Sequence, residues 1–248
     1  MNERALLAEQ PAMHYTDEVF APLDRDHQLE RIAGGNETEV YRTDDQRYVV
    51  KLKSELGGSR DEALQHARVM RVAAEQFVAC LGPEQSIPSF YVVSRDQQGR
   101  AQVLVMQPFV AHAQPLYHVD YAALSDQQRR DIARNLRLII RRALAFYRAT
   151  GSMPDLYGRS SASAAERQRT NGLHRLPHRL WSFLVERSLL RSHNLLLTDT
   201  PDDHVVLVDY DIVRRGRLYR RVYYAVRWLL FWRDLLLIWR MVRRGAAR

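Results

Sequence analysis

Lysine is almost missing from this chain of 248 residues, because 35 of its 37 cationic residues are arginine. The only two lysines, Lys51 and Lys53, lie together in the apolar run Tyr48–Lys53. Lysine carries a compact charge on a slim stem, whereas arginine ends in a broad planar fork. A strand from which a slender cation must reach a phosphate therefore favours lysine. The alternative is that two surface lysines occur here by chance.

The chain also lacks the features of secreted and membrane-spanning proteins. Its single cysteine, Cys80, excludes a disulfide framework and suits a reducing compartment. No stretch of 18 residues is continuously apolar, so no transmembrane helix is predicted. Residues 1–26 contain early acids and no apolar segment of a signal peptide. We therefore expect a cytoplasmic protein, with association at the inner face of the membrane left open.

Acidic residues are nearly absent from the end of the chain. Residues 214–248 hold 11 arginines and one acid, Asp234, and their net charge of +10 leaves −2 for the rest of the chain. The body is therefore close to neutral, which makes a nucleic-acid-binding domain an unfavoured interpretation. The positive charge of the C-terminal segment instead predicts a partner with an acidic surface.

The hydrophobic patterns predict an α+β protein of two lobes, with a strand-rich N-terminal half and a mostly helical C-terminal half. The border is expected near residues 108–114, and residues 1–26 are expected to be irregular or partly helical. Capping-box patterns mark helix starts at Ser59 and Ser125. The expected strands cover residues 29–32, 39–42, 48–52, 89–94, 101–109, 194–198 and 205–209, and the expected helices cover residues 59–77, 125–151 and one or two parts of 217–248.

The candidate functional residues follow one another in a definite order: a glycine turn at Gly34-Gly35, a strand with Lys51, a helix with the early acid Glu62, and a hairpin with Asn194 and Asp209. This order resembles the protein-kinase-like fold, and within it the aminoglycoside and choline phosphotransferase branch more than the protein kinases. The resemblance covers about Gln28–Val213. It implies a kinase-type enzyme that uses ATP and Mg²⁺ to move a γ-phosphoryl group to a hydroxyl group. It also implies a nucleotide-binding N-lobe over 28–110 and a C-lobe over 111–216 with an insertion at about 159–192. Outside the resemblance, the residue patterns predict a lead-in over residues 1–27 and C-terminal helices over 217–248.

By this resemblance, Lys51 is the strand lysine that contacts the α- and β-phosphates and is held by a helix glutamate. The run Val49-Val50-Lys51-Leu52 is similar to the family's Val-Ala-Ile-Lys pattern. Lys51 is nearer to the strand centre than Lys53 and is therefore preferred. Glu62 is its preferred partner and Glu75 the other candidate. The alternative role of Glu62 is helix capping alone.

The resemblance also implies further nucleotide contacts, for which the sequence motifs are weaker. Gly34 and Gly35 would bring main-chain N–H groups to the phosphates, although a plain hairpin turn explains them equally well. Residues 103–109 resemble the strand and hinge beside an adenine, which places Gln107 and Phe109 there. The alternative is that Met106 and Phe109 are ordinary core residues.

The metal site is the strongest part of the resemblance. Residues 193–197 and 206–211 are similar to the family's metal-binding hairpin. Mg²⁺ prefers a few hard oxygen ligands, and water and phosphate oxygens complete its octahedron. Asn194 and Asp209 are therefore expected to bind it, with Asp211 as a secondary ligand or orienting group. The alternative is an ordinary hairpin with an exposed acid at its end.

One position departs from the family pattern. The family's catalytic Asp lies five residues before the metal Asn, where this chain has Leu189. Asp155, in the loop after the long helix, is the candidate base if residues 159–192 are an insertion within that loop. If they are not, the chain is expected to be a pseudokinase, which is a nucleotide-binding or regulatory module without phosphoryl transfer.

The acceptor and the partners stay open at this point. The acceptor is a hydroxyl-bearing small molecule, a lipid or glycan headgroup, or a protein. Aromatic, apolar and arginine residues recur along residues 217–248, and such a helix can lie on an anionic membrane surface. The alternative is that this segment completes the helical lobe, with its arginines, including Arg227, on the solvated side. A peripheral membrane adaptor with a kinase-like body is a further candidate.

Overall fold

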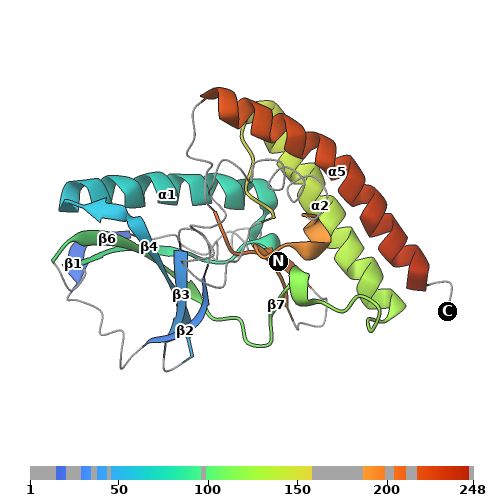
Figure 1. The fold of residues 1–248 in the computed structure, drawn as a ribbon, viewed down its shortest axis with the longest axis horizontal. Coiled ribbons are helices and arrows are strands. Elements are labelled where there is room, and N and C mark those ends of the chain that lie inside the picture. Colours follow the sequence, from blue (N-terminus) through green and yellow to red (C-terminus); the bar gives the residue numbers. More distant parts are fainter. Residues whose placement is uncertain are drawn as a thin grey trace, which may run out of the picture. The chain divides into compact units, whose positions relative to one another are not determined.

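The computed structural model describes residues 15–20, 29–34, 38–43, 46–95, 99–157, 187–198, 204–210 and 217–245 (Figure 1). They form two compact units. The first comprises the described residues up to Gln76 together with Ile87–Phe109, and the second comprises Phe77–Ser86 and all described residues from Val110 onward. The α+β class is confirmed, with a strand-rich and a helix-rich part. The chain passes from the first unit to the second after Phe109.

Six strands form the sheet of the first unit, in the order β1-β5-β6-β4-β3-β2 (Figure 1). Neighbouring strands are antiparallel except for β1 and β5, which are parallel. The five strands that the sequence predicts in this unit are confirmed as β2 (Leu29–Gly34), β3 (Thr38–Thr43), β4 (Tyr48–Gly58), β5 (Phe90–Arg95) and β6 (Ala101–Pro108).

The N-terminal segment departs from the expectation. The sequence predicts irregular or partly helical structure over residues 1–26, but Tyr15–Phe20 forms the edge strand β1. This strand pairs with β5, far later in the chain, with Tyr15 opposite Tyr91. An open edge of β5 leaves main-chain groups unpaired, and β1 satisfies them. The prediction for this stretch is therefore wrong, because a distant strand and not the local pattern determines its conformation.

Alternation along β4 places its side chains on two faces of the sheet. Val50 faces a buried apolar cluster, whose members are Tyr41, Val50, Leu52 and Leu104. Lys51 therefore lies on the opposite face, between Val40 of β3 and Val105 of β6 in the register. That face also carries the buried side chains of Tyr91, Val93 and Val103.

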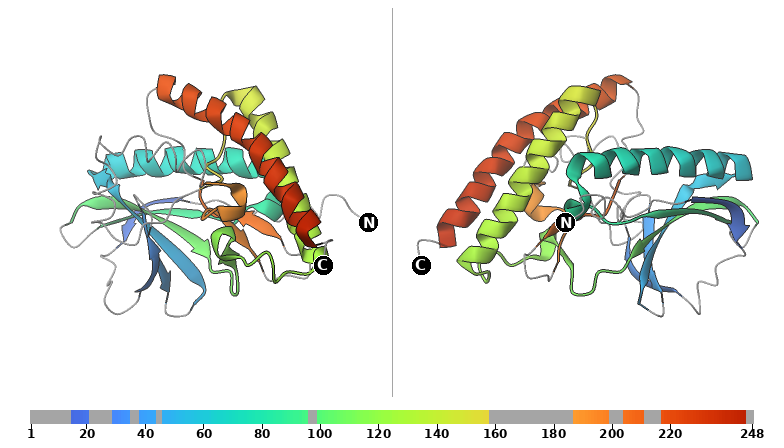
Figure 2. Two further views of the ribbon diagram at one scale, coloured as in Figure 1. Left: turned by 45° about the vertical axis from the view of Figure 1, so that its right-hand side comes forward. Right: turned by 180° about the vertical axis from the view of Figure 1, so that it is seen from behind.

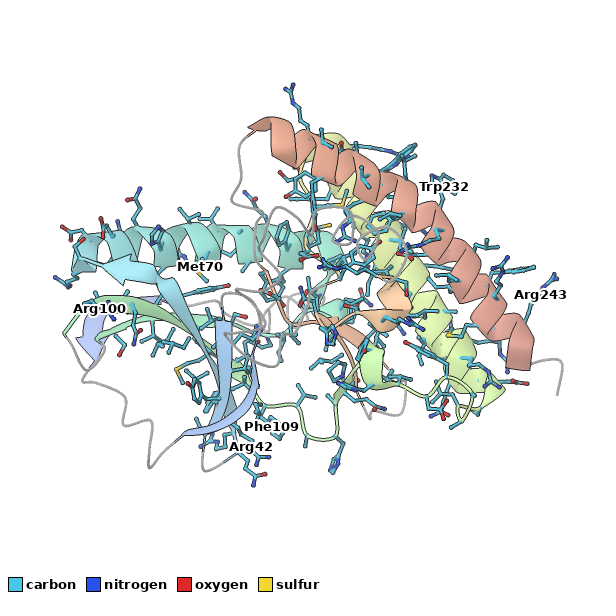
Figure 3. The ribbon with its side chains drawn as sticks, in the orientation of Figure 1. Arg42, Met70, Arg100, Phe109, Trp232 and Arg243 are labelled. Atoms are coloured by element: carbon cyan, nitrogen blue, oxygen red, sulfur yellow. The ribbon has the colours of Figure 1, made fainter. Side chains whose placement is uncertain are left out.

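Helix α1 (Arg60–Leu81) runs along the sheet through its residues Arg60–Gln76 (Figure 1). Its buried side chains in this part are mostly small, which permits close packing of a helix on a sheet. They are Ala63, Ala67, Met70, Ala73 and Ala74, and Figure 3 labels Met70. We infer that α1 covers the face that carries Lys51.

Local signals fix the starts of both predicted long helices. At α1, the Ser59 N–H donates to Oε2 of Glu62 and the Glu62 N–H donates to Oγ of Ser59, both at 3.2 Å. At α2 (Asp126–Thr150), Ser125 and Gln128 exchange the same pair of hydrogen bonds. Gly151 ends α2 with a φ of 69°, in the left-handed region that glycine adopts without steric cost. Both capping predictions are confirmed.

The second unit is built on α2 and α5 (Arg217–Gly245), which lie side by side (Figures 1 and 2). The last turn of α1 belongs to this unit, where Phe77 meets Phe146 of α2 edge-on with ring centroids 5.6 Å apart. A small antiparallel sheet completes the unit and confirms the predicted hairpin. Its strands are β7 (Gln114–Pro115), β8 (Leu195–Leu197) and β9 (Val205–Leu207), and the short 3₁₀ helices are η1 (Pro83–Gln85), η2 (Leu116–His118) and η5 (Leu189–Arg191).

Helix α5 alone occupies the described part of the C-terminal segment. Its buried side chains recur every three or four residues, and they are Tyr224, Arg227, Phe231, Asp234, Ile238 and Met241. This face packs on the helical unit, as one of the two sequence interpretations predicts. Arg227 is only 1% exposed, so its expected place on the solvated side is wrong, because aromatic rings surround its guanidinium. Among the described helices, none has an apolar stretch that is long enough to cross a membrane.

Candidate functional site

Three consecutive carbonyl groups join two segments of the second unit that are far apart in sequence. The first, from Asp155, accepts a hydrogen bond from Nδ2 of Asn194 at 2.8 Å. The carbonyl of Leu156 accepts from the Ser192 hydroxyl at 2.6 Å, and the carbonyl of Tyr157 accepts from the main-chain N–H of His193 at 3.0 Å. The loop that follows α2 is thereby fixed against the segment that enters β8. The structure thus brings together the candidate base and one candidate metal ligand.

This junction bears on the insertion expected at about residues 159–192. Most of that range, residues 158–186, lies outside the described residues. Residues 187–192 belong to the helical unit, because Ser188 and Leu189 are buried there. The extent of the insertion stays a prediction. Leu189, at the family's catalytic position, is part of the apolar core, and the two sides of the expected insertion meet at Asp155 and Asn194.

The same hydrogen bond orients the side chain of Asn194. Since Nδ2 donates to Asp155, the amide oxygen Oδ1 is directed away from that carbonyl. The main-chain carbonyl of Asn194 accepts from the N–H of Val208 at 3.0 Å, which continues the β8–β9 pairing by one residue. Asp209 follows directly, so Asn194 and Asp209 lie at the same end of the hairpin, as expected. Asp211, the expected secondary ligand, lies outside the described residues.

The carboxylate of Asp155 lies between its own loop and α5. Its Oδ1 accepts from the main-chain N–H of Tyr157 at 3.2 Å, and the hydroxyl of Tyr223 donates to the same oxygen at 3.4 Å. Burial, and then the negative charge of Asp155, raise the pKa of the Tyr223 hydroxyl far above its usual range, although Arg227 opposes the shift. Tyr223 is therefore a neutral donor that positions the candidate base.

Arg227 of α5 completes a buried polar cluster that the sequence reasoning missed. Its guanidinium carbon lies 3.8 Å from the ring centroid of Tyr157 and 5.1 Å from that of Tyr223. Burial lowers the pKa of Arg227, but Tyr223 and Asp155 raise it by more, so the guanidinium stays charged. Desolvated cation–π contacts contribute about 2 kcal/mol or more. The sequence signal that could have placed Arg227 inside is the regular spacing of Tyr224, Phe231 and Ile238, because Arg227 falls on the same helical face.

Asp234 of α5 anchors the same loop from the other side. The hydroxyl of Tyr157 donates to its Oδ2 at 2.6 Å, and the guanidinium of Arg233 donates to its Oδ1 at 3.0 Å. Arg233 also donates to the carbonyl of Arg187. Burial raises the pKa of Asp234, while the Tyr157 hydrogen bond and the Arg233 charge oppose the rise. Asp234 therefore links α5 to Tyr157 in the loop after α2, and its neighbour Arg233 links α5 to the segment that begins at Arg187.

A small group of rings borders Asn194. The imidazole of His193 stacks on the ring of Tyr117 with centroids 4.4 Å apart, and His118 lies edge-on to His193 at 6.3 Å. Burial lowers the pKa of His193, and the neighbouring His118 and Arg187 charges lower it further. The imidazole of His193 is therefore neutral at neutral pH.

Lys51 belongs to the first unit, where its partly buried side chain lies beside the valines of the neighbouring strands. Its two candidate partners have other contacts. The carboxylate of Glu62 accepts the N–H of Ser59, and Glu75 lies 3.6 Å from Arg71, one helical turn earlier. The capping interpretation of Glu62 is confirmed, while its pairing with Lys51 stays a prediction.

The predicted hinge residues are held by contacts within the first unit. Gln107 is buried, and its Nε2 donates to the hydroxyl of Ser89 at 2.8 Å. The main-chain N–H of Phe109 donates to the carbonyl of Arg47 at 2.8 Å, and the guanidinium carbon of Arg42 lies 5.5 Å from the Phe109 ring centroid (Figure 3). An adenine would therefore have to use main-chain groups of this segment other than the N–H of Phe109.

The glycine turn is described only in part. Gly34 is the last residue of β2 and pairs with Glu39 of β3. Gly35 lies outside the described residues. The antiparallel pairing of β2 with β3 fits a hairpin turn, and a phosphate-binding role for these glycines stays a prediction.

The donor set at the hairpin suits a hard cation that also binds phosphate. Asn194 offers Oδ1, Asp209 offers a carboxylate, and Mg²⁺ commonly takes only one or two protein ligands beside phosphate oxygens and water. In the part of the chain that the structure describes, no group of three or more His, Cys, Asp or Glu side chains is arranged to hold a metal ion. An ion at this hairpin would therefore draw most of its ligands from a bound nucleotide and water.

No model of a known protein family matches the chain, and no curated protein matches it. The expected kinase-like fold consequently stays a prediction from the sequence motifs.

Proposed function

We propose that the chain is a phosphotransferase of the protein-kinase-like fold, which uses ATP and Mg²⁺ to phosphorylate a hydroxyl group. One observation carries the proposal, namely the hydrogen bond from the side chain of Asn194 to the carbonyl of Asp155. It joins the candidate metal ligand to the loop of the candidate base across 39 residues of sequence. Such a contact is what a catalytic loop interrupted by an insertion requires.

Each residue has a separate role in this proposal. Lys51 binds the α- and β-phosphates, and Asn194 and Asp209 hold the metal ion, with Asp211 assisting. A bound Mg²⁺ neutralises charge on the β- and γ-phosphates. Asp155 accepts the proton of the acceptor hydroxyl while the acceptor oxygen bonds to the γ-phosphorus and the bond to the leaving oxygen of ADP breaks.

The acceptor is a hydroxyl compound, which is a small molecule, a lipid or glycan headgroup, or a protein. The donors around Asp155 hold its loop but do not select among these acceptors.

The test measures hydrolysis of ATP labelled in the γ-phosphate, in which water takes the place of the unidentified acceptor. We expect slow, Mg²⁺-dependent release of phosphate that falls by about a hundredfold or more in Asp155→Ala, because general-base catalysis contributes at least that much. ATP binding should persist in this variant. The matched control is Asp61→Ala, at an exposed position of α1, which should leave turnover unchanged.

The second candidate is a pseudokinase. The observation in its favour is that Oδ1 of Asp155 already accepts hydrogen bonds from Tyr157 and Tyr223. A pseudokinase binds ATP, releases phosphate no faster than buffer, and is unchanged in both respects by Asp155→Ala. Absence of nucleotide binding would contradict both candidates.

A further inference from the structure

Helix α5 is apolar on the side opposite to its buried face. Its exposed apolar side chains are spaced so that they share one side of the helix. We call them the α5 stripe, and they are Val222, Leu229, Trp232, Leu236 and Trp239, each 41–62% exposed. Figure 3 shows Trp232 and Arg243 on the outer side of α5. From Val222 to Trp239 the stripe is about 25 Å long, at the rise of an α-helix.

The stripe is a continuous surface feature and not a chance scatter of apolar residues. Of the nine large apolar side chains that are exposed among the described residues, five lie on it. The other four are distributed over β2, α1 and η2, and they are Ile32, Val69, Val72 and Tyr117. Single exposed apolar residues are normal on protein surfaces, whereas a contiguous patch marks a contact with another surface.

The charges that flank the stripe on α5 have one sign. Arg221, Arg240 and Arg243 are exposed, and the guanidinium carbon of Arg243 lies 4.0 Å from the ring centroid of Trp239. Asp234, the only acid of α5, is buried on the opposite face. The accessible side of α5 therefore offers apolar groups and cations but no carboxylate.

We propose that the α5 stripe binds the surface of an anionic bilayer. Tryptophan favours the level of the lipid headgroups, and leucine and valine favour the acyl boundary beneath it. Each arginine near an anionic surface strengthens binding about fivefold, the equivalent of about 1 kcal/mol. The helix lies along the interface, because its other face is packed on the helical unit.

A second copy of the chain is the competing occupant of this surface. The three- and four-residue spacing of the stripe is also that of a coiled-coil seam. Pairing two α5 helices through their stripes would bring the arginines of one helix against those of the other, with no exposed acid on either helix to offset the repulsion. The charge of α5 therefore favours an anionic lipid surface over self-association.

This inference goes beyond the proposed phosphotransfer. No residue of the stripe belongs to the candidate site, so membrane binding and nucleotide binding can succeed or fail separately.

The first test is flotation of the full chain with phosphatidylcholine vesicles that contain about 30 mol % phosphatidylglycerol. We expect the protein to float with these vesicles and not with vesicles of phosphatidylcholine alone. About 0.5 M salt should release much of it, because the Debye length then falls below about 5 Å. Three of the four tryptophans lie on α5, so tryptophan emission of the unmodified chain should also shift to the blue with the anionic vesicles only.

Matched variants separate the apolar and the charged contributions. Trp232→Gln with Trp239→Gln should weaken partitioning by about tenfold or more, whereas Val69→Gln with Val72→Gln on α1 should leave it unchanged. Arg240→Gln with Arg243→Gln should weaken it by about tenfold or more, whereas the exposed pair Arg137→Gln with Arg141→Gln on α2 should have little effect. All of these positions are exposed, so the variants are expected to fold.

Three outcomes would overturn the proposal. The first is equal recovery of the unmodified chain with neutral and anionic vesicles, or no recovery with either. The second is equal partitioning of the stripe variant and its α1 control. The third is a dimer in sedimentation that the Trp232→Gln, Trp239→Gln variant abolishes while vesicles recover no protein, which would assign the stripe to a second copy of the chain.

Discussion

The side-chain amide of Asn194 donates a hydrogen bond of 2.8 Å to the main-chain carbonyl of Asp155, and this contact decides which atom of Asn194 can meet a ligand. An amide has a donor end and an acceptor end, so using Nδ2 on the loop leaves Oδ1 for the other side. A carboxylate has no donor and could not make this contact. Asparagine is thereby the side chain that can link the loop and still present an oxygen.

The first prediction concerns the stability of this link. Asn194→Ala should lower the free energy of unfolding by about 1–2 kcal/mol, because it leaves a partly buried carbonyl without its donor. Asn194→Asp should lower it more, since a carboxylate oxygen would then face the carbonyl oxygen. Urea unfolding measures both. Gln127→Ala at an exposed position of α2 is the control, and an Asn194→Asp variant as stable as the parent chain would contradict the account.

Local sequence signals predicted the elements that carry the candidate site. The capping boxes at Ser59 and Ser125, the glycine stop at Gly151 and the alternation in β4 act within a few residues of one another, so their effect does not depend on the rest of the fold. The hairpin that carries Asn194 was found for the same reason.

The remaining features depend on contacts between distant segments. Strand β1 pairs with the edge of β5, far later in the chain, and its own residues carry no clear pattern. Arg227 and Asp234 look like surface charges in sequence, but cation–π contacts and the hydroxyl of Tyr157 satisfy them inside the helical unit. A pattern that treats every charge as solvated cannot identify such residues.

The second prediction isolates the hydrogen bond from Tyr157 to Asp234. Tyr157→Phe keeps the ring that stacks on Phe231 but removes the hydroxyl, so the buried carboxylate loses one donor. We expect the free energy of unfolding to fall by about 1.5–3 kcal/mol, the usual contribution of a hydrogen bond to a charged group. Tyr117→Phe, at an exposed tyrosine, is the control. Equal stability of the two variants in urea would show that Asp234 does not anchor the loop.

The third prediction concerns pH. The pKa of His193 is lower in the folded chain than in the unfolded one, because burial and the charges of His118 and Arg187 disfavour its protonation. The unfolded state therefore binds more protons below about pH 6.5, and stability falls as the pH drops through this value until the folded pKa is passed. His193→Gln should lose less stability than the parent chain between about pH 7 and about pH 5. An unchanged slope in His193→Gln would refute the assignment.

The fourth prediction uses the single cysteine. Burial raises the pKa of Cys80 from 9.0 to about 11, although the charge of Arg142 opposes the shift, and the thiol donates to the carbonyl of Arg142 at 3.3 Å. At about pH 8 the thiolate fraction should be about a hundredfold lower than in the unfolded chain. Alkylation by iodoacetamide should therefore be slower by at least that factor in the native protein. Native and urea-unfolded chains that react at similar rates would contradict the burial of Cys80.

The most direct measurement is titration calorimetry of the chain with ATP in the presence and absence of Mg²⁺. The account predicts Mg²⁺-dependent binding that weakens by about tenfold or more in Lys51→Met and in Asp209→Asn. The first variant removes the cation that meets the phosphates, and the second removes a carboxylate that holds the metal ion. The controls Lys53→Met and Glu84→Gln should bind as the parent chain does. Parent-like affinity in both Lys51→Met and Asp209→Asn, or no binding of ATP by the parent chain, would contradict the central claim.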